Sequence, residues 1–315
     1  MSAAPAAGIV SAAPAAGNVP AGTEPAIAPA ALAQLAVAVV LLGASWPVTK
    51  LALLDGAAPS WFACGRAALS MLVGFALLGL TRRLRWPGRP DLPALAALGL
   101  LQLGGFFALA HAAVAWVPAG RTAILSNATL VWTVPITVLV MRETISPRRW
   151  LAAALSAAGV AVLIGPWAID WHSGDVLLGH GFLMAAALSW AMAMTIVRRW
   201  PPRLSMLQLL PWAFALATLV LLPLAAAHGP GQWSPVSLGC LGLIGLLMGP
   251  AGTWCIAQAT TALPLVVASV GFLAGPAVGL LVSVIWLGEP MTPSIGLGAA
   301  LLLVSAGLAA TGGRA

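Results

Sequence analysis

Long apolar segments separated by short polar breaks fill most of the 315-residue chain. A bilayer core takes about 20 apolar residues per helix, and runs of about that length recur ten times in this sequence. The breaks carry turn-forming residues, as in His228-Gly229-Pro230-Gly231. The pattern predicts an all-α polytopic membrane protein with ten transmembrane helices, at residues 31–54, 59–80, 92–115, 120–141, 147–165, 176–198, 204–226, 236–258, 263–287 and 292–311.

The composition supports a membrane protein and excludes a soluble one. Hydrophobic residues make up 61% of the chain, charged residues only 7%, and the mean hydropathy is +1.02. A soluble domain would carry roughly a quarter charged residues to hydrate its surface. Cys64, Cys240 and Cys255 form no Cys-x-x-Cys pair and lie in apolar segments, so we interpret them as buried packing residues. No cluster has metal-ligand spacing, and we expect neither a metal nor another cofactor.

The arrangement of charges predicts the orientation. Basic residues give the chain a net charge of +7, which in a soluble protein would suggest nucleic acid as a partner. With ten spans, however, eleven of the fourteen basic residues fall on the side that holds both termini: Arg82, Arg83, Arg85, Arg89, Arg142, Arg148, Arg149, Arg198, Arg199, Arg203 and Arg314. The positive-inside rule therefore places both termini in the cytoplasm of a bacterial inner (plasma) membrane and removes the case for nucleic acid. Residues 1–30, rich in alanine and proline, are predicted to be a disordered cytoplasmic tail.

A five-residue motif occurs twice. Glu143-Thr144-Ile145-Ser146-Pro147 returns as Glu289-Pro290-Met291-Thr292-Pro293, an offset of 146 residues, and Ser45-Trp46 returns as Ser189-Trp190 at 144. Spans one to five, residues 31–165, therefore correspond to spans six to ten, residues 176–311. Because five is odd, the second half is inverted in the membrane relative to the first. Inverted repeats of this kind are typical of transporters.

With these motifs the sequence resembles the drug/metabolite transporter superfamily, and within it the ten-helix proteins with two EamA-type repeats. The resemblance rests on the two Ser-Trp pairs, the repeated Glu-x-[IM]-[ST]-Pro junction, Arg66 in span two and Gly275-Pro276 before Glu289. It covers about residues 31–311 and implies a helix bundle with a central substrate cavity and transport without ATP. One position departs from the pattern: the first-half equivalent of Pro276 is Leu130, and the nearby proline is Pro135. We therefore expect the kink in span four to be displaced.

Charged groups inside the spans are the first candidates for a binding site. Lys50, Arg66, His111 and Arg121 are predicted near the outer ends of spans one to four. A charge at the centre of a membrane helix costs about 2.5–3.5 kcal/mol, so each should reach the interface, pair with an opposite charge such as Asp55, or line a cavity. Lys50, Arg66 and Arg121 are replaced in the second half by Met194, Trp212 and Val267, so folding of the repeat alone does not demand these charges. Arg66 is an exception, because an arginine at this position is common in the family that the sequence resembles, and a structural role is left open for it.

Our hypothesis is that Lys50, helped by Arg66 or Arg121, attracts an anionic group of the substrate. If a proton is coupled to transport, His111 is the candidate group. Asn127 and Gln258 should face the interior, because an unpaired amide is costly in lipid. The predicted substrate-binding residues are Trp46, Lys50, Arg66, Gln102, His111, Asn127, Trp132, Trp190, Trp254, Gln258 and Phe272, with Phe106 in the same cavity.

Small residues and helix breaks predict where spans eight and nine touch other helices or bend. Stripes of glycine allow close helix contact, and proline interrupts helical hydrogen bonding. Such breaks occur at membrane depth where they face protein or a water-filled cavity. The predicted gating or packing residues are Gly249, Pro250, Gly271, Gly275, Pro276 and Gly279.

Together these features predict a secondary transporter, with export favoured, that moves a small metabolite, amino acid or drug-like solute by alternating access. Its partners would be the small-molecule substrate and the lipid bilayer; a homodimer is left open. A membrane-embedded enzyme or a non-transporting scaffold are the alternatives. The first would need clustered acid–base or metal-binding residues near one membrane face, and the second would need large soluble loops. The sequence shows neither feature, so we expect no enzymatic activity.

Overall fold

The computed structural model describes residues 29–310 apart from 264–266, 268–270 and 272–273. Residues 1–28 of the predicted tail, part of span nine and Phe272 lie outside it, and α1 begins at Pro29, inside the last two residues of that predicted tail. The first half contains α1 (Pro29–Leu54), α2 (Pro59–Leu80), a 3₁₀ turn (Arg89–Asp91), α3 (Leu92–Ala96), a π-helix (Ala97–Gly105), α4 (Phe106–Trp116), α5 (Ala119–Leu125), α6 (Leu130–Leu139) and α7 (Pro147–Ile164). The second contains α8 (Gly174–Arg199), α9 (Met206–Ala227), α10 (Pro235–Gly242), a π-helix (Leu243–Met248), α11 (Gly249–Ala262), α13 (Ala274–Leu287) and α14 (Pro293–Ala310).

The helices agree with the predicted membrane spans. Nine helical segments of the described chain are long and apolar enough to cross a membrane, and Ala274–Leu287 is a shorter apolar helix within the ninth predicted span. The ten-helix, two-repeat membrane fold predicted from the sequence is thereby confirmed. The three cysteines are free and buried, as expected of packing residues.

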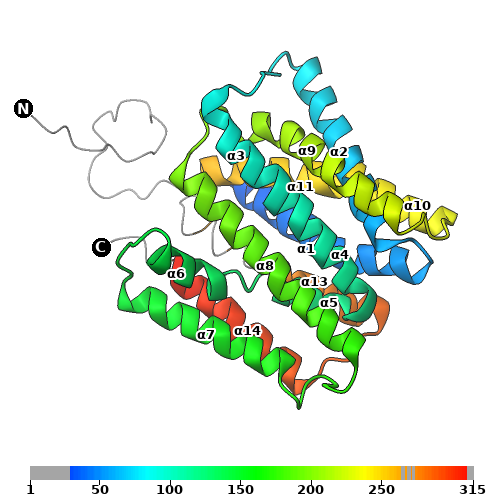
Figure 1. The fold of residues 1–315 in the computed structure, drawn as a ribbon, viewed down its shortest axis with the longest axis vertical. Helices are drawn as coiled ribbons and strands as arrows, with labels where there is room; N and C mark the ends of the chain where they lie inside the picture. Colours follow the sequence, from blue (N-terminus) through cyan, green and yellow to red (C-terminus); the bar gives the residue numbers. More distant parts are fainter. Residues whose placement is uncertain (1–28, 264–266, 268–270, 272–273, 311–315) are drawn as a thin grey trace, which may run out of the picture.

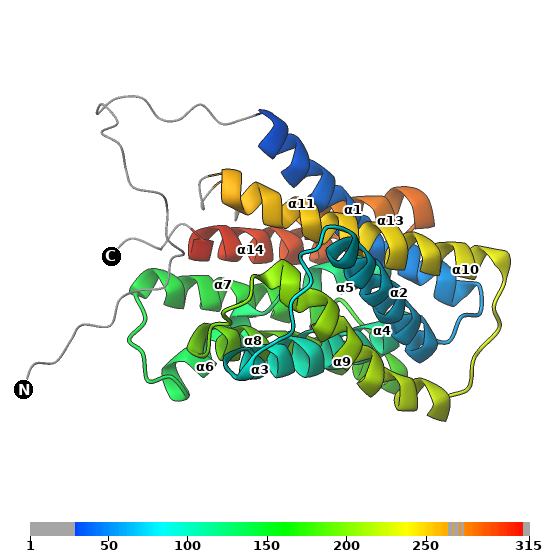
Figure 2. The same ribbon diagram turned by 90° about the horizontal axis from the view of Figure 1, so that it is seen from above.

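The two halves pack through equivalent helices. The second helices of the halves, α2 and α9, lie against each other, and so do the last helices, α7 and α14. In the same way α1 packs against α11 while its counterpart α8 packs against α4. The α7–α14 pair is visible in both views of the bundle, in Figure 1 and from above in Figure 2. Interchanging the two halves turns each contact of this set into another contact of the same set, as a repeat with pseudo-twofold symmetry requires.

Two π-helices occupy the same place in the repeat, because Ala97–Gly105 and Leu243–Met248 begin 146 residues apart. A π-turn leaves backbone carbonyls displaced from the regular α-helical ladder. Ser189 Oγ donates to the carbonyl of Leu101 at 2.8 Å, and Ser70 Oγ to that of Gly245 at 3.0 Å. The sequence predicted an irregularity in span eight from Gly249-Pro250, which follow the second π-helix. Span three has no such proline, so its π-helix was not predicted.

Of the glycines predicted to pack helices, Gly271 and Gly279 lie at close approaches, whereas a Cβ atom on Gly275 would meet nothing within 4 Å. A Cβ atom on Gly43 of α1 would lie 2.5 Å from the carbonyl oxygen of Gly275, and one on Gly279 would lie 2.9 Å from that of Gly43. Gly271 meets the side chain of Leu35 in the same way. Small residues therefore let α1 and α13 pack backbone to backbone.

Span four is interrupted in a different place from the expected kink. The break lies at residues 126–129, between α5 and α6, whereas Pro135 lies inside α6. Turn hydrogen bonds replace the helical ladder there: the amide of Asn127 donates to Ile124 at 3.1 Å and that of Ala128 to Leu125 at 3.0 Å. The interruption is thus made by consecutive tight turns, with no proline among the four residues.

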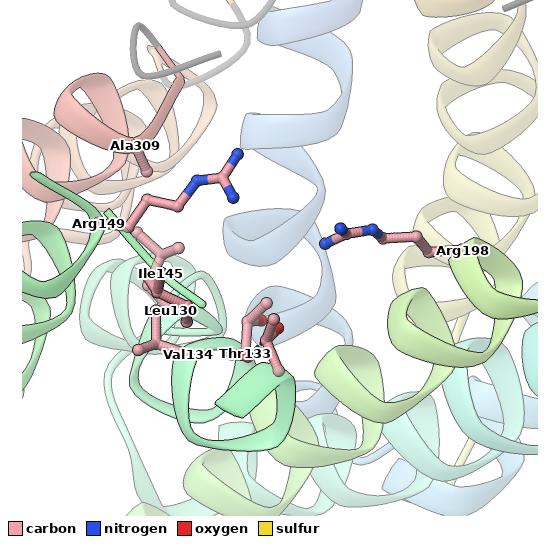
Figure 3. Close-up of a pocket in the computed structure, with 8 residues that line it drawn as sticks. Leu130, Thr133, Val134, Ile145, Arg149, Arg198 and Ala309 are labelled. Carbon is pink, nitrogen blue, oxygen red and sulfur yellow. Dashed lines mark hydrogen bonds between the residues drawn. The ribbon is translucent and has the colours of Figure 1, made fainter. Parts of the chain in front are cut away.

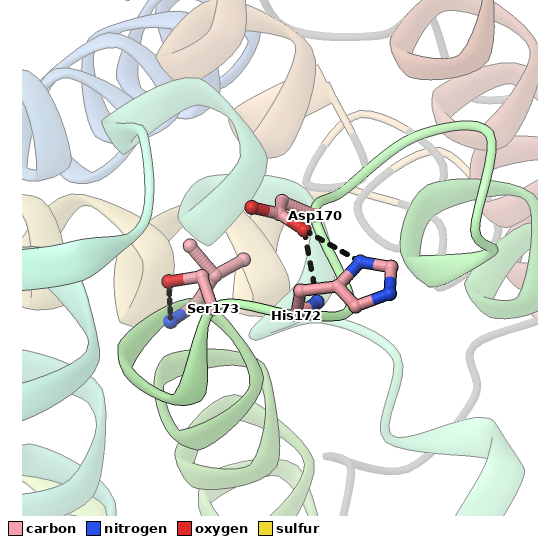
Figure 4. Close-up of polar contacts among 4 residues, drawn as sticks. Asp170, His172 and Ser173 are labelled. Carbon is pink, nitrogen blue, oxygen red and sulfur yellow. Dashed lines mark hydrogen bonds and ion pairs between the residues drawn. The ribbon is translucent and has the colours of Figure 1, made fainter.

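An exposed segment connects the halves. Asp170 Oδ1 accepts a hydrogen bond from the backbone of His172 at 2.8 Å, and Ser173 Oγ caps α8 by accepting from the amide of Val176 (Figure 4). The side chain of His172 is 99% exposed. These local contacts order the start of the second half.

Candidate functional site

Aromatic side chains from both halves meet inside the bundle. Trp46 of α1 and Trp190 of α8, the tryptophans of the two Ser-Trp pairs, both contact Phe106 of α4, with ring centroids 6.1 and 5.0 Å from it. Both contacts are edge-to-face, a favourable geometry for aromatic rings. Phe106 is 6% exposed and belongs to the main hydrophobic core. Repeat-related residues thus form one cluster where the two halves join.

Arg66 of α2 lies beside this cluster. Its guanidinium stacks over the ring of Phe107, 4.4 Å from the centroid, and its Nη1 lies 3.2 Å from Nε2 of His111. Nδ1 of the fully buried His111 lies 2.7 Å from the carbonyl of Phe107, one helical turn earlier. Because a carbonyl can only accept, Nδ1 carries the proton and Nε2 accepts from Arg66. The two bonds therefore fix His111 as a neutral imidazole.

The other two cations of the first-half spans donate to backbone carbonyls. Lys50 Nζ donates to the carbonyls of Val114 at 2.6 Å, Ala115 at 3.3 Å and Val117 at 3.4 Å, the carboxyl end of α4. Arg121 Nη2 donates to the carbonyl of Ala168 at 3.1 Å. A cation suits the negative end of the helix dipole. Lys50 therefore makes contacts that stabilise the fold, and the pair with Asp55, one of the alternatives left open by the sequence, is not among its contacts.

Glu289 ties the two halves together at the end of the bundle with few arginines, the arginine-poor end. Its Oε1 accepts from the amide of Ala119 at 2.6 Å and its Oε2 from that of Gly120 at 2.9 Å, so the carboxylate caps α5. Glu289 also lies close enough to Lys50 and Arg121 to interact electrostatically with both. A second-half carboxylate thus caps a first-half helix.

The opposite, arginine-rich end contains a cavity of about 110 Å³. Arg149 of α7 and Arg198 of α8 point toward each other across it, above Thr133 and Leu130 of α6 (Figure 3). Arg198 pairs with Glu143, the repeat equivalent of Glu289, at 2.6 Å. This end of the bundle is therefore hollowed and basic.

Two further carboxylates join the halves. Asp91, which is 3% exposed, accepts from the amides of Gly88, Arg203 and Leu204 at 2.9, 2.6 and 3.0 Å. At the arginine-poor end Asp55 accepts from the hydroxyl of Ser234 and from the amide of Ser237 at 3.1 Å, at the start of α10. Neither aspartate is part of the aromatic cluster.

Of the residues predicted to bind substrate, the structure brings together Trp46, Arg66, His111 and Trp190. Gln102 lies on the preceding π-helix and Trp132 on α6; the Oε1 of the first and the Nε1 of the second are buried without a hydrogen-bond partner in the described chain. Trp254 and Gln258 are exposed on α11, and Phe272 lies outside the described residues.

Asn127 and Gln258 are both exposed, and their orientation toward the interior stays a prediction. The amide of Asn127 donates to the carbonyl of Ala123 at 2.8 Å, within its own helical turn. A local bond of this kind removes the need for a partner in the bundle.

Sequence reasoning missed the role of Phe107 and the cavity arginines. Phe107 precedes His111 by four residues and therefore shares its helix face, a spacing that could have identified it. From the sequence, Arg149 and Arg198 were used only to predict which side of the membrane holds the termini. Nothing in the sequence indicates that their side chains face one cavity, because they come from helices in different halves.

Comparison with known proteins identifies the family. The chain matches the EamA-like transporter family at residues 30–165 and 177–311. It is 26% identical over 219 residues to "Uncharacterized transporter YdeK" of Bacillus subtilis (strain 168), which covers 68% of this chain and 74% of that protein. It is 23% identical over 219 residues, 68% of this chain and 70% of the relative, to an "Uncharacterized transporter" of Clostridium kluyveri.

A solved structure shares the fold. A chain described as "Crystal structure of protein" superposes with a TM-score of 0.61 and 18% identity, over 89% of this chain and 96% of that one. Two family matches in tandem cover nearly all of the described helices. The chain therefore belongs to the EamA-like transporter family and is a multi-pass membrane transporter.

Proposed function

We propose that this protein is a secondary transporter that moves a small amphipathic solute across the bacterial inner membrane by alternating access. The observation that carries the proposal is the meeting of Trp46 and Trp190 at Phe106. Transporters built from inverted repeats bind substrate where the two halves join. A site contacted by equivalent residues of both halves can remain in contact with a solute while the halves move relative to each other.

The difference between the two ends supports alternating access. Glu289 caps α5 at the arginine-poor end, whereas a cavity opens between Arg149 and Arg198 at the other. A hollow of about 150 Å³, lined by residues that include Trp171 and His180, also lies at the arginine-poor end, so the difference between the ends is the Glu289 cap rather than the presence of a hollow. If the arginine-rich end is cytoplasmic, as the positive-inside rule indicates, the contact that would open and close lies on the outer side; export is the direction we propose.

Counterflow in proteoliposomes tests the function. The full chain is purified, reconstituted with an internal panel of unlabelled metabolites, amino acids and drug-like solutes, and exposed to each labelled counterpart. We expect accumulation of at least one solute, and loss of that accumulation in Trp46→Leu and Trp190→Leu. Trp150→Leu is the matched control, because Trp150 is 50% exposed at the start of α7.

The outcomes separate the alternatives. If no panel member accumulates above protein-free liposomes, the transport proposal fails and the scaffold interpretation is favoured. If a solute is consumed and a new compound appears, the protein is a membrane-embedded enzyme. Repeating counterflow with an imposed pH gradient then tests whether a proton is coupled.

A pair of repeat-equivalent cysteines tests the orientation. Thr144 and Pro290 lie 146 residues apart and are both exposed. With Cys64, Cys240 and Cys255 replaced by alanine, we expect a membrane-impermeant thiol reagent applied to intact cells to label Pro290→Cys and spare Thr144→Cys. The reverse pattern would place the arginine-rich end outside.

A further inference from the structure

The positive charge of Arg66 has no acidic partner in the described chain. Six of the seven acidic residues are described, and each has a position away from Arg66. Asp55 accepts hydrogen bonds at the start of α10, Asp91 accepts them from amides near residues 88 and 203–204, and Glu289 accepts them at the start of α5. Glu143 pairs with Arg198 and Asp170 with His172, and Asp175 lies in the first turn of α8.

The neighbours of Arg66 also lack an oxygen acceptor for it. Lys50 and Arg121 donate to backbone carbonyls, but the only hydrogen-bond acceptor of Arg66 among the described residues is Nε2 of His111. A guanidinium has five N–H donors and is costly to hold in an apolar bundle without acceptors. Arg66 thus has donors left over, and it is half-buried rather than sealed in the core.

The orientation of Arg66 suits a planar anion. One face of the guanidinium lies on the ring of Phe107, and one nitrogen is directed to His111. Both contacts are to neutral groups, so they hold the plane in place without cancelling the charge. The edge that remains is a fork of N–H groups, which matches the two oxygens of a carboxylate.

The surroundings of His111 are aromatic. Its ring lies 6.2 Å from that of Trp46 and 6.0 Å from that of Phe62, and Trp46 in turn contacts Phe106. Phe62 and Phe106 are buried, whereas Trp46 is half-buried, so its indole is the flat apolar surface near Arg66 for the body of a ligand. Lys50, one turn after Trp46 on α1, is occupied by the carbonyls at the end of α4.

From this geometry we propose that Arg66 is the anion-binding residue of the transport site and that the transported solute joins a carboxylate to an apolar body. The inference rests on the proposed transport function. It moves the anion-attracting role that the sequence suggested for Lys50 onto Arg66, the one of the two without carbonyl partners. Phe107 and His111 are positioning residues, because they act on the solute through the guanidinium.

Matched pairs of probes test the proposal. Counterflow of an accumulated panel solute is inhibited with N-acetyl-L-phenylalanine or its carboxamide, and with N-acetyl-L-leucine or its carboxamide. A charge-assisted hydrogen-bonded pair is worth about tenfold or more in affinity, so we expect each carboxylate to inhibit at least tenfold more strongly than its amide. Arg66→Gln should reduce this ratio to about one.

Controls separate recognition from folding. Arg83→Gln removes an exposed arginine of the loop after α2 and should keep the wild-type ratio. If Arg66→Gln is not monodisperse by size exclusion, Arg66→Lys decides, because it keeps the charge but loses the planar fork; we expect a ratio reduced severalfold. Phe107→Leu should weaken carboxylate inhibition more than amide inhibition, since it removes the support of the guanidinium.

Each result decides one claim. Wild-type transport with equal inhibition by acids and amides would overturn the role of Arg66 and leave the transport function standing. An unchanged ratio in well-folded Arg66→Gln or Arg66→Lys would do the same. Absence of transport by the wild-type chain overturns both proposals.

Discussion

The two copies of the glutamate motif have the same backbone and different partners. The amide of Glu143 donates to the carbonyl of Thr137, and that of Glu289 to Ser283, both at 3.3 Å and both pairs offset by 146 residues. Yet the Glu143 carboxylate forms an exposed ion pair with Arg198, whereas the Glu289 carboxylate caps a helix of the other half. The comparison shows that local sequence specifies the turn, and that the packing of the halves decides what the carboxylate binds.

The largest expected effect is at the arginine-rich end, where the buried Asp91 and the more exposed Glu143 both contact the second half. Asp91→Ala leaves three backbone amides without their buried acceptor. We expect the free energy of unfolding to fall by about 2–4 kcal/mol, measured as a lower melting temperature in detergent. Glu143→Ala, which removes a solvent-exposed pair, should cost less than about 1 kcal/mol. Equal losses would contradict the distinction.

The next-largest effect is expected from removing the contact by which Glu289 caps α5 at the arginine-poor end. In Glu289→Gln the amide nitrogen faces a backbone N–H and the negative charge at the start of α5 is lost. We expect a cost of about 1–2 kcal/mol, which corresponds to roughly a tenfold more frequent opening. The measurement is the rate at which an impermeant thiol reagent labels Val117→Cys, a buried position between α4 and α5, with the native cysteines replaced.

Glu143→Gln is the matched control for that experiment, since it changes the equivalent residue at the other end. It should alter labelling of Val117→Cys by less than about twofold, because an exposed ion pair contributes little. An equal increase in both variants would mean that Glu289 has no specific role in closing the arginine-poor end.

A smaller effect separates Lys50 from Arg66. Lys50→Met installs the residue found at the equivalent position of the second half, Met194, and removes the cation from the end of α4. We expect a loss of about 1 kcal/mol in stability, seen as a lower melting temperature, with the acid-to-amide inhibition ratio unchanged. A ratio that falls with Lys50→Met as far as with Arg66→Gln would return the anion site to Lys50.

The smallest effect tests the shared turn itself. Arg142 has φ of 54°, and its repeat equivalent Gly288 has φ of 66°. A non-glycine residue in the left-handed region costs about 1 kcal/mol. Replacing it with glycine removes this cost, but the greater freedom of glycine in the unfolded chain cancels part of the stabilisation. Arg142→Gly should therefore raise the melting temperature slightly, and Gly288→Arg should lower it. A large loss in Arg142→Gly would show that its side chain has an essential contact.

The ten spans and their pairing into halves could be predicted because hydropathy, arginine placement and the repeated motif are local signals. The targets of the carboxylates could not. Glu289 binds the amides of Ala119 and Gly120, and a backbone amide leaves no mark in the sequence. For the same reason the turns at 126–129 were missed, since residues 126–129 contain neither glycine nor proline.

The candidate site was predicted in part. Trp46, Arg66, His111 and Trp190 were chosen for their residue type inside apolar segments, and the fold brings them together. The sequence could not decide which cation lacks an oxygen acceptor. Arg66 and its nitrogen acceptor His111 lie 45 residues apart on different helices. Lys50 and Arg66 look alike in the sequence, and only the position of the end of α4 distinguishes them.

The two π-helices also carry information about how the protein arose. A π-turn accommodates one residue more than an α-helical turn, so each marks the trace of an insertion into a regular helix. Both begin at the same position of the repeat, 146 residues apart, although their sequences differ. A shared place in the repeat is what one insertion in an ancestral five-helix unit, copied by duplication of that unit, would leave.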